Sequence, residues 1–499
     1  MTPRSRSHVS PLRFQLVTRE GLAAISISVV LGAALASEGS LGWLLAGACL
    51  ALLTLALILA YTATPHWQLE IPLTLLLTST LVWRVRDVSA ITSQPLDPAG
   101  LLRVALLCTA AGLALLSVPL QSTARFLRGA SLPYLMYALV ALVSALLATH
   151  IGLALFRAAE LALGIFIVAA AVASDPDHWR TRALRVLLGF TSISLLIVFL
   201  EAVIVPDLAL RPISDYGPFA APFNFRLEGV FPHAAANTVG TYGVFLILLT
   251  IYAAHSRFLT SRIRAVLLCL GVAAVLLSQY RTGYLALAGV SLLLALVNRR
   301  YRSAAVLAVL GIVLTAAFVS PATFVEPIRG LLFRGQTPEM LTSLTGREQF
   351  WDAALTVWAQ SPWFGLGLSS GTRFDVLAHL GYGTVSTIHS TWIEALVGTG
   401  LLGISLLASA FAFTCFQAFR LRLLFPMMVL VALLVRSTTG TTVELMGYQA
   451  VLFAIAVHWT AAPQRVNSVP QPREGEAVST LTASPAASEA HAHFARPRH

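Results

Sequence analysis

Long apolar runs recur along almost the whole chain, and they decide which solvent the chain can fold in. Of the 499 residues, 57% are hydrophobic and only 11% are charged, too few to cover a soluble protein of this size. Hydrocarbon offers backbone groups no partner, so each apolar run of about 20 residues predicts a helix that crosses a membrane. The sequence therefore predicts an all-α fold, a polytopic integral membrane helical bundle.

The runs give an expected total of about 12–14 transmembrane helices. They cover residues 20–37, 41–62, 69–83, 100–120, 131–149, 151–173, 184–205, 236–254, 264–279, 281–297, 303–320, 388–411, 423–436 and 446–461. The predicted domains are a cytoplasmic N-terminal segment (1–19), a transmembrane domain (20–461) and a disordered cytoplasmic tail (462–499) rich in Pro, Ala, Ser, Glu and His.

Arginines fix the expected orientation. The net charge is +11, and clusters of arginine lie in the short connections near residues 125–128, 180–185, 257–264, 299–302 and 420–422. A cytoplasmic N-terminus places all of these clusters in the cytoplasm, as the positive-inside rule requires. This distribution is not that of a nucleic-acid-binding protein, which gathers basic residues on one soluble face. We expect both termini inside and two long outer loops, 206–235 and 321–387.

The second outer loop contains TGREQFWDAALTVWAQSPW, residues 345–363, whose apolar residues recur at helical spacing. The expected apolar stripe comprises Phe350, Trp351, Ala354, Leu355, Val357 and Trp358. Tryptophans suit an amphipathic helix at the headgroup level, whereas a cap packed on the bundle without chemistry is the alternative.

Arg281 lies in SQYRTG, between two apolar runs with almost no loop. A guanidinium inside the membrane costs about 2.5 kcal/mol or more at the centre and less toward the surface, so it normally has a partner. Two interpretations remain open: a side chain that snorkels to lipid phosphate, and a fork for an anionic ligand such as a diphosphate.

His389 stands at the start of the run that ends in GTGLLG. A neutral imidazole can take a proton from a hydroxyl near neutral pH, but a histidine at a helix start is also commonly a cap or a packing residue. Glu394 follows five positions later, about 140° around an ideal helix, so it is not an obvious partner and could face an adjacent helix.

Other patterns favour ordinary structural roles. Gly398, Gly400 and Gly403 spell GxGxxG without a preceding strand, so small residues easing helix contact explain them better than a dinucleotide site. Arg157 and Glu160, one turn apart, are interpreted as a structural ion pair, with a proton or ion relay as the alternative. The histidines of the outer loops lack zinc-ligand spacing, and we expect no metal and no cofactor.

Four motifs in order carry a resemblance to a known family. They are FRLEGVFPHAAANTVG from Phe225, SQYRTG from Ser278, TGREQFWDAALTVWAQSPWFGLG from Thr345, and HSTWIEALVGTGLLG from His389. Together they resemble the O-antigen ligase and polymerase superfamily, most strongly between Arg226 and Gly403, and the core of that resemblance is expected to span about residues 200–461.

The resemblance implies a metal-independent, inverting glycosyltransferase of the bacterial inner membrane whose active site faces the periplasm. The donor would be a glycan on undecaprenyl diphosphate, and the acceptor would be a hydroxyl of a glycan or a lipid. His389 is then the candidate catalytic residue, with Arg281, Arg226 and Arg347 as candidate diphosphate ligands. Arg373, Glu394, His233 and Arg436 are candidate accessory groups. Membrane lipids are expected partners, and nucleic acid is not.

A transporter or flippase for an anionic lipid-linked glycan is the alternative function. It would use the same arginines together with the Arg157 and Glu160 pair. Transporter folds commonly show internal repeats with broken helices at matching positions, and the sequence shows no such self-similarity. The long outer loop also suits a surface site better than a midplane site, so we favour the glycosyltransferase.

Overall fold

The computed structural model is almost wholly helical, as predicted from the apolar runs. It describes residues 68–83, 97–128, 131–212, 225–256, 258–297, 299, 347–376, 379–380 and 388–461. The expected N-terminal segment, the runs 20–37, 41–62 and 303–320, and the tail lie outside the described residues. The only named strands within those ranges are β1 (Leu210–Pro212) and β2 (Phe225–Leu227), which pair antiparallel.

Five described helices are long and apolar enough to cross a membrane. They are α5 (Pro98–Ser117), α8 (Ile151–Ser174), α9 (Trp179–Ile204), α11 (Ala236–His255) and α19 (Thr391–Arg420). The shorter ones are α3 (Glu70–Ser79), α6 (Leu120–Phe126), α7 (Leu132–Ser144) with η3 (Ala145–Leu147), α10 (Pro206–Ala209), α12 (Ser261–Leu277), α13 (Arg281–Val297), α17 (Arg347–Trp358), the π-helix η6 (Gly371–Val376), α20 (Leu424–Ser437) and α21 (Tyr448–Ala461).

Every predicted run within the described residues contains a helix, but the lengths differ. Helix α19 continues to Arg420, whereas the expected run ended at residue 411, because the sequence stays apolar up to that arginine. Helices α20 and α21 have only 14 residues each, fewer than the roughly 20 that a crossing needs.

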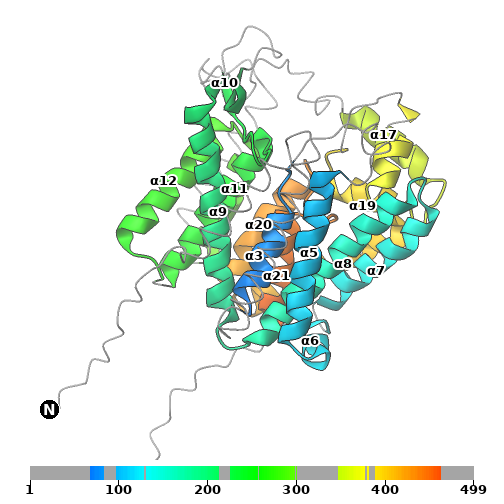
Figure 1. Ribbon diagram of the computed structural model, residues 1–499, viewed down its shortest axis with the longest axis horizontal. Coiled ribbons are helices and arrows are strands. Elements are labelled where there is room, and N and C mark those ends of the chain that lie inside the picture. The colour runs from blue at the N-terminus through cyan, green and yellow to red at the C-terminus, as the bar shows by residue number, and fades with distance from the viewer. Residues whose placement is uncertain are drawn as a thin grey trace, which may run out of the picture. The chain divides into compact units, whose positions relative to one another are not determined.

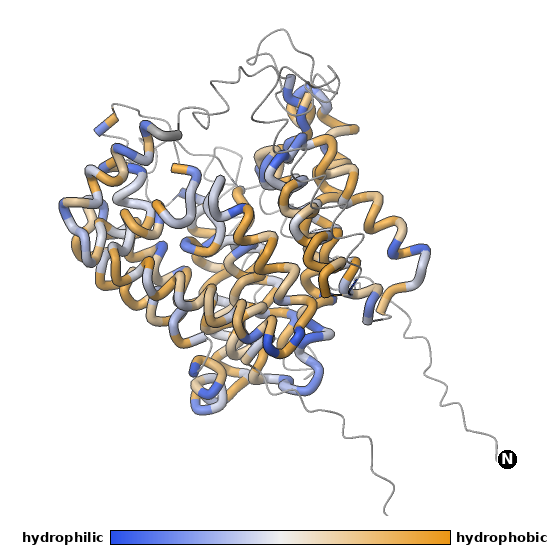
Figure 2. Tube along the Cα trace, turned by 180° about the vertical axis from the view of Figure 1, so that it is seen from behind, coloured by the Kyte–Doolittle hydropathy of each residue, from blue (hydrophilic) through white to orange (hydrophobic). Residues whose placement is uncertain are grey.

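Helices α20 and α21 lie side by side (Figure 1). Helices α11 and α13 pack against α20, and helices α8 and α19 pack against α21. Figure 2 shows that apolar residues colour most of the length of the helices and that polar residues concentrate at helix ends and connections. The pattern fits helices whose middle parts face either each other or lipid.

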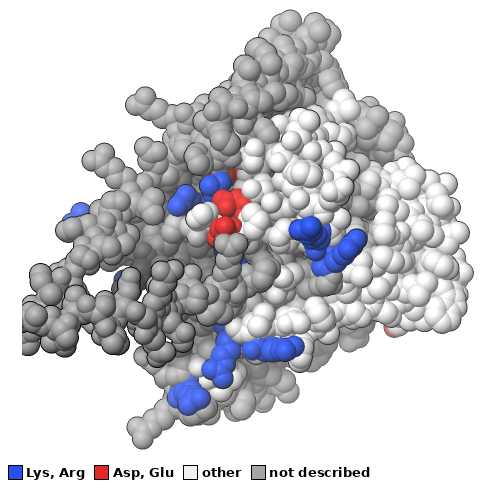
Figure 3. Space-filling model, turned by 90° about the horizontal axis from the view of Figure 1, so that it is seen from below, with Lys and Arg blue, Asp and Glu red and all other residues white. Residues whose placement is uncertain are grey.

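Exposed arginines mark the connections that were predicted to be cytoplasmic. They include Arg125 and Arg128 at the end of α6 and just after it, Arg262 and Arg264 at the start of α12, and Arg420 and Arg422 at the end of α19 and just after it. Seen from below, basic side chains lie in several groups on the described part of this face, and one group adjoins acidic side chains (Figure 3). The orientation in the membrane stays a prediction from the charge pattern.

Helix α19 is broken at Gly400, where the backbone has φ 64°. The segment 362–367 fits against this break and binds the backbone groups around it. Four hydrogen bonds join them: Leu366 N to Val397 O at 2.8 Å, Gly367 N to Gly398 O at 3.0 Å, Leu401 N to Pro362 O at 2.8 Å and Leu402 N to Trp363 O at 3.2 Å. The glycine motif is thus more than a helix contact: Gly400 supplies a conformation that other residues rarely adopt.

Helix α17 confirms the amphipathic helix expected in the outer loop. Phe350, Ala354, Val357 and Trp358 of the predicted stripe belong to a small apolar cluster that also contains Ile388 and Val397. Leu355 was wrongly placed on that stripe, since it is 44% exposed. The residue lies one helical position away from Ala354, about 100° around the axis, which turns it out of the packed face.

We predict that Gly400→Ala destabilises the protein by about 2 kcal/mol or more, because a strained backbone and a steric clash add up. A Cβ at this position would lie 2.3 Å from the Trp363 carbonyl carbon. Thermal unfolding in detergent measures the effect. Gly112→Ala in α5 is the control, since a Cβ there meets nothing within 4 Å. Equal melting temperatures for the two variants would contradict the role of the break.

Candidate functional site

Arg281 follows the turn between α12 and α13, and contacts of the two preceding residues fix the position of its backbone. Gln279 has φ 51° and donates from Nε2 to the carbonyl of Phe225 at 2.8 Å, which ties the turn to β2. The side chain of Tyr280 packs so closely on Gly240 of α11 that a Cβ added there would lie 2.3 Å from the Cβ of Tyr280. Arg281 then opens α13 with a partly buried side chain.

The β1–β2 ribbon brings Arg226 next to a second arginine. Arg211 and Arg226 face each other in the register, and Nε of each contacts a different oxygen of the buried Glu228 carboxylate, at 3.4 and 2.8 Å. Two guanidiniums therefore share one carboxylate, so these three described side chains carry one positive charge in excess. Arg211 is 60% exposed, so its guanidinium is accessible to solvent.

His233 lies close to the same ribbon. Its backbone N–H donates to the carbonyl of Val82 at 2.7 Å. Burial lowers the pKa of its imidazole, and the nearby Arg211 guanidinium acts in the same direction, against the raising effect of Glu228 and of a hydrogen bond at Gly229. The imidazole is therefore neutral over a wider pH range than in an unfolded chain.

His389 is exposed, and its backbone has φ 55°, a conformation that is uncommon for any residue but glycine. The preceding residue, Ile388, is held on both sides. Its N–H donates to Oε2 of Glu394 at 3.4 Å, and its carbonyl accepts from Nε1 of Trp351 at 3.1 Å. Since the backbone before His389 is fixed, the imidazole has a defined origin at the start of α19.

Glu394 explains part of this geometry, although its spacing had not suggested a partnership with His389. Its carboxylate is buried, and Oε1 accepts from the hydroxyl of Thr372 at 2.9 Å. The Arg373 guanidinium interacts electrostatically with the same carboxylate. Glu394 thus joins η6 to the backbone before His389, and Arg373 is placed beside a structural carboxylate.

The linker 438–447 between α20 and α21 connects these parts. At its start, Arg436 donates from Nη1 to the hydroxyl of Tyr280, and its guanidinium carbon lies 5.1 Å from the centre of that ring. Within the linker, the hydroxyl of Thr439 lies 3.1 Å from that of Thr282. Both contacts fall on the turn that carries Arg281.

The same linker also reaches the start of α19. The hydroxyl of Thr391 donates to the carbonyl of Gly440 and lies within hydrogen-bond distance of the Thr442 hydroxyl, both at 2.9 Å. Trp392 donates from Nε1 to Ser437 at 3.1 Å. The segments that carry Arg281, Arg436 and His389 are therefore joined through one linker.

Most of the predicted site residues thus fall into two linked groups. Arg281, Arg436, His389 and Glu394 lie on segments that meet at the linker. Arg226 lies on the ribbon tied to the Arg281 turn, and His233 lies close to that ribbon. Arg373 lies beside Glu394. Arg347 opens α17, but its side chain lies outside the described residues.

Sequence reasoning missed the residues that hold this arrangement. Glu228 lies only two positions from Arg226. Arg103 of α5 donates from Nη2 to the carbonyl of Met446 in the linker at 3.2 Å, and an ionisable residue within a predicted span is a signal that could have found it. Within the described ranges, no group of three or more His, Cys, Asp or Glu side chains is close enough to hold a metal ion.

These features are those of a multi-pass helical membrane protein in which arginine-bearing turns and a histidine-bearing segment contact one buried linker. Residues 265–408 match the family model described as O-Antigen ligase, a range that includes both Arg281 and His389. This part of the chain is therefore similar to the O-antigen ligase family, which supports the resemblance found in the sequence. No curated protein matches the chain.

We predict that His233→Gln reduces the loss of thermal stability between about pH 7.5 and about pH 5.5. The folded pKa lies below the reference value of 6.5, so the unfolded chain binds more protons as the pH falls below that value. Stability is thus full above this range and is lost as the pH falls toward the folded pKa. Melting temperatures in detergent test this, with the exposed His255→Gln as the control. A loss as large in His233→Gln as in the unchanged protein would contradict it.

Proposed function

We propose that this protein transfers a glycan from undecaprenyl diphosphate to an acceptor hydroxyl at the outer face of the bacterial inner membrane. The observation that carries the proposal is the joining of the Arg281 and His389 segments through the linker 438–447. Transfer from a diphosphate needs fixed positive charge at the leaving group and a base at the acceptor. Arg281 would supply the charge and His389 the base.

In the proposed reaction the acceptor oxygen attacks the anomeric carbon of the donor sugar as its proton passes to the His389 imidazole. The bond between the anomeric carbon and the phosphate oxygen breaks, and its electron pair leaves with the diphosphate. Attack from the face opposite the leaving group inverts the anomeric centre. His389 is a candidate for this role because it is exposed and its backbone is fixed.

Guanidinium groups would stabilise the charge that develops on the diphosphate. A planar guanidinium presents two parallel N–H donors to two phosphate oxygens and keeps its charge at any physiological pH. Arg281 is the first candidate because the turn before it is fixed by Gln279 and Tyr280. Arg226 is the second, with Arg347 and Arg436 as further candidates.

The family match supports this reading over the transporter alternative. The Arg157 and Glu160 pair on which the alternative relied is present, but Glu160 also binds Arg103, as expected of a structural cluster. A ligase and a polymerase differ in the acceptor, and product length with each kind of acceptor distinguishes them.

We predict that His389→Ala and Arg281→Ala each lower the rate of glycan transfer by about 100-fold or more, the scale of losing a general base or an oxyanion-stabilising charge. Purified protein with a polyprenyl diphosphate glycan and a panel of acceptors provides the assay. His255→Ala and Arg262→Ala are matched controls, since both side chains are exposed at helix ends away from the site. Near-normal transfer by either site variant would remove that residue from the mechanism.

We further predict that transfer continues at an unchanged rate in an excess of EDTA, because guanidinium groups supply the positive charge that a divalent cation would otherwise provide. The same assay is run with and without added magnesium after chelation. A rate that collapses with EDTA and returns with magnesium would show that the arginines do not suffice.

A further inference from the structure

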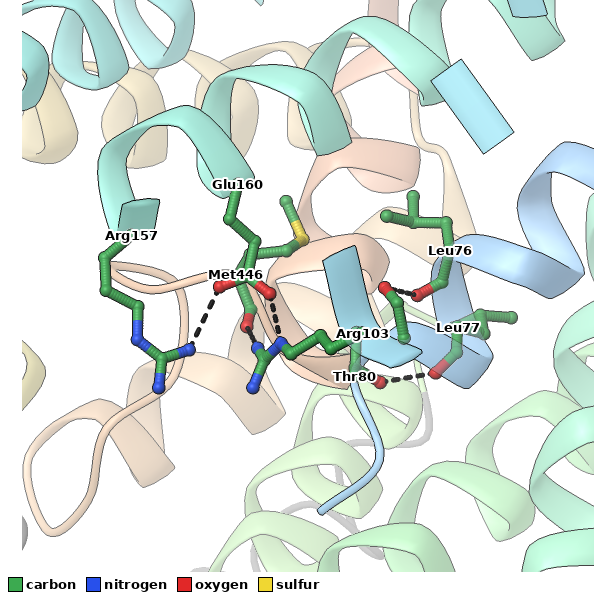
Figure 4. A network of polar contacts seen from close by, with 8 residues as sticks. Leu76, Leu77, Thr80, Arg103, Arg157, Glu160 and Met446 are labelled. Carbon is green, nitrogen blue, oxygen red and sulfur yellow. Dashed lines mark hydrogen bonds and ion pairs between the residues drawn. The ribbon is translucent and has the colours of Figure 1, made fainter. Parts of the chain in front are cut away.

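A buried cluster of two arginines and one glutamate lies apart from the residues assigned to catalysis. Arg103 of α5 donates from Nε to Oε1 of Glu160 on α8, and Arg157 donates from Nη1 to Oε2 at 3.0 Å (Figure 4). The Glu160 side chain has no exposed surface, and each arginine side chain is 16% exposed. Both oxygens of the carboxylate are thus paired.

Arg103 makes one contact that Arg157 does not. Its Nη2 donates to the carbonyl of Met446 at 3.2 Å, so one guanidinium binds α8 and the linker 438–447 together (Figure 4). The Met446 side chain also packs on α8, where a Cβ on Gly164 would lie 2.0 Å from its methyl carbon. The Arg103 guanidinium therefore attaches the linker to helices α5 and α8.

Two tyrosines of α7 hold the same part of the linker. Tyr134 donates its hydroxyl to the carbonyl of Val443 at 2.8 Å, and Tyr137 donates to the carbonyl of Glu444 at 3.1 Å. With the contact to Met446, three carbonyls of the buried end of the linker accept from side chains of α5 and α7. The other end of the linker reaches the turn of Arg281 and the start of α19.

Stability alone does not require such a cluster. Replacing a buried ion pair by apolar side chains is often neutral or stabilising, because the attraction between the charges barely offsets their desolvation. This cluster also binds the backbone carbonyl of Met446, and it thereby fixes the position of the linker 438–447, which is neither helix nor strand. The segments that carry Arg281, Arg436 and His389 all contact this linker.

We propose that Arg103 is a positioning residue, which sets the linker 438–447 and through it the donor-binding part of the site around Arg281 and Arg436. The expected effect on donor binding rests on the proposed function, whereas the role of Arg103 in holding the linker does not. Removing the contact between Arg103 and Met446 frees the linker, and the donor then binds more weakly.

The test compares Arg103→Gln with Arg157→Gln. Each change removes one positive charge and one partner of Glu160 from side chains of equal exposure, but only the first removes the contact to Met446. Hydrogen–deuterium exchange of the full-length protein in detergent reports on amides of the linker. A transfer assay with polyprenyl diphosphate glycan gives KM and kcat. Arg103→Lys keeps the charge beside Glu160, and so protects folding, but lacks the fork that reaches two acceptors.

We expect faster exchange in the linker and a KM for the donor raised about tenfold in Arg103→Gln and Arg103→Lys, with kcat changed far less, as for a loss of binding. Arg157→Gln should leave both quantities near those of the unchanged protein. Equal linker exchange in the Arg103 and Arg157 variants would overturn the positioning role. Faster exchange without a change in KM would overturn its link to donor binding. If the unchanged protein shows no transfer, the proposed function fails and the exchange comparison still decides whether Arg103 positions the linker.

Discussion

Backbone groups outside helices must find hydrogen-bond partners inside an apolar bundle, and the linker 438–447 shows how this protein provides them. Its carbonyls accept from Tyr134 and Tyr137 of α7, from Arg103 of α5 and from Thr391 of α19. Four donors from three helices thus support a segment with no regular structure. Because the donors are fixed by their own helices, the linker has one defined position, and its residues 439–442 are brought to the turn of Arg281 and to the start of α19.

The break in α19 follows from the same requirement. At Gly400 the regular hydrogen bonds within the helix are interrupted. Backbone groups of the segment 362–367 form hydrogen bonds with the backbone groups that are left without helical partners. Ser144 of α7 adds a hydroxyl that donates to Gly398 at 2.6 Å and accepts from Gly367 at 2.9 Å. The part of α19 before Gly400, which begins beside His389, is thereby attached to the segment 362–367 and to α7, so that its direction is set independently of the part after Gly400.

The apolar runs sufficed to predict the helices, because membrane-spanning segments need only length and hydrophobicity. Arg281 could be singled out for a similar reason: a charge between two apolar runs is costly and therefore informative. The linker 438–447 could not be predicted, since its threonines and two glycines are typical of an exposed loop. Its burial depends on Tyr134 and Arg103, hundreds of residues earlier in the chain. Local spacing also gave no hint that Glu394 holds the backbone before His389, because the chain turns back on itself there.

Two carboxylates of this protein each bind two arginines, and the role of those arginines differs with the exposure of their side chains. Glu228 and Glu160 are each shared by two guanidiniums, so both places carry excess positive charge. At Glu228 one partner, Arg211, is mostly exposed, and the excess charge faces water, where an anion can approach. At Glu160 both arginines are largely buried, and Nη2 of Arg103 donates to a backbone carbonyl. The same ratio of charges thus gives an exposed guanidinium in one setting and an internal attachment in the other, because a buried guanidinium needs partners within the protein.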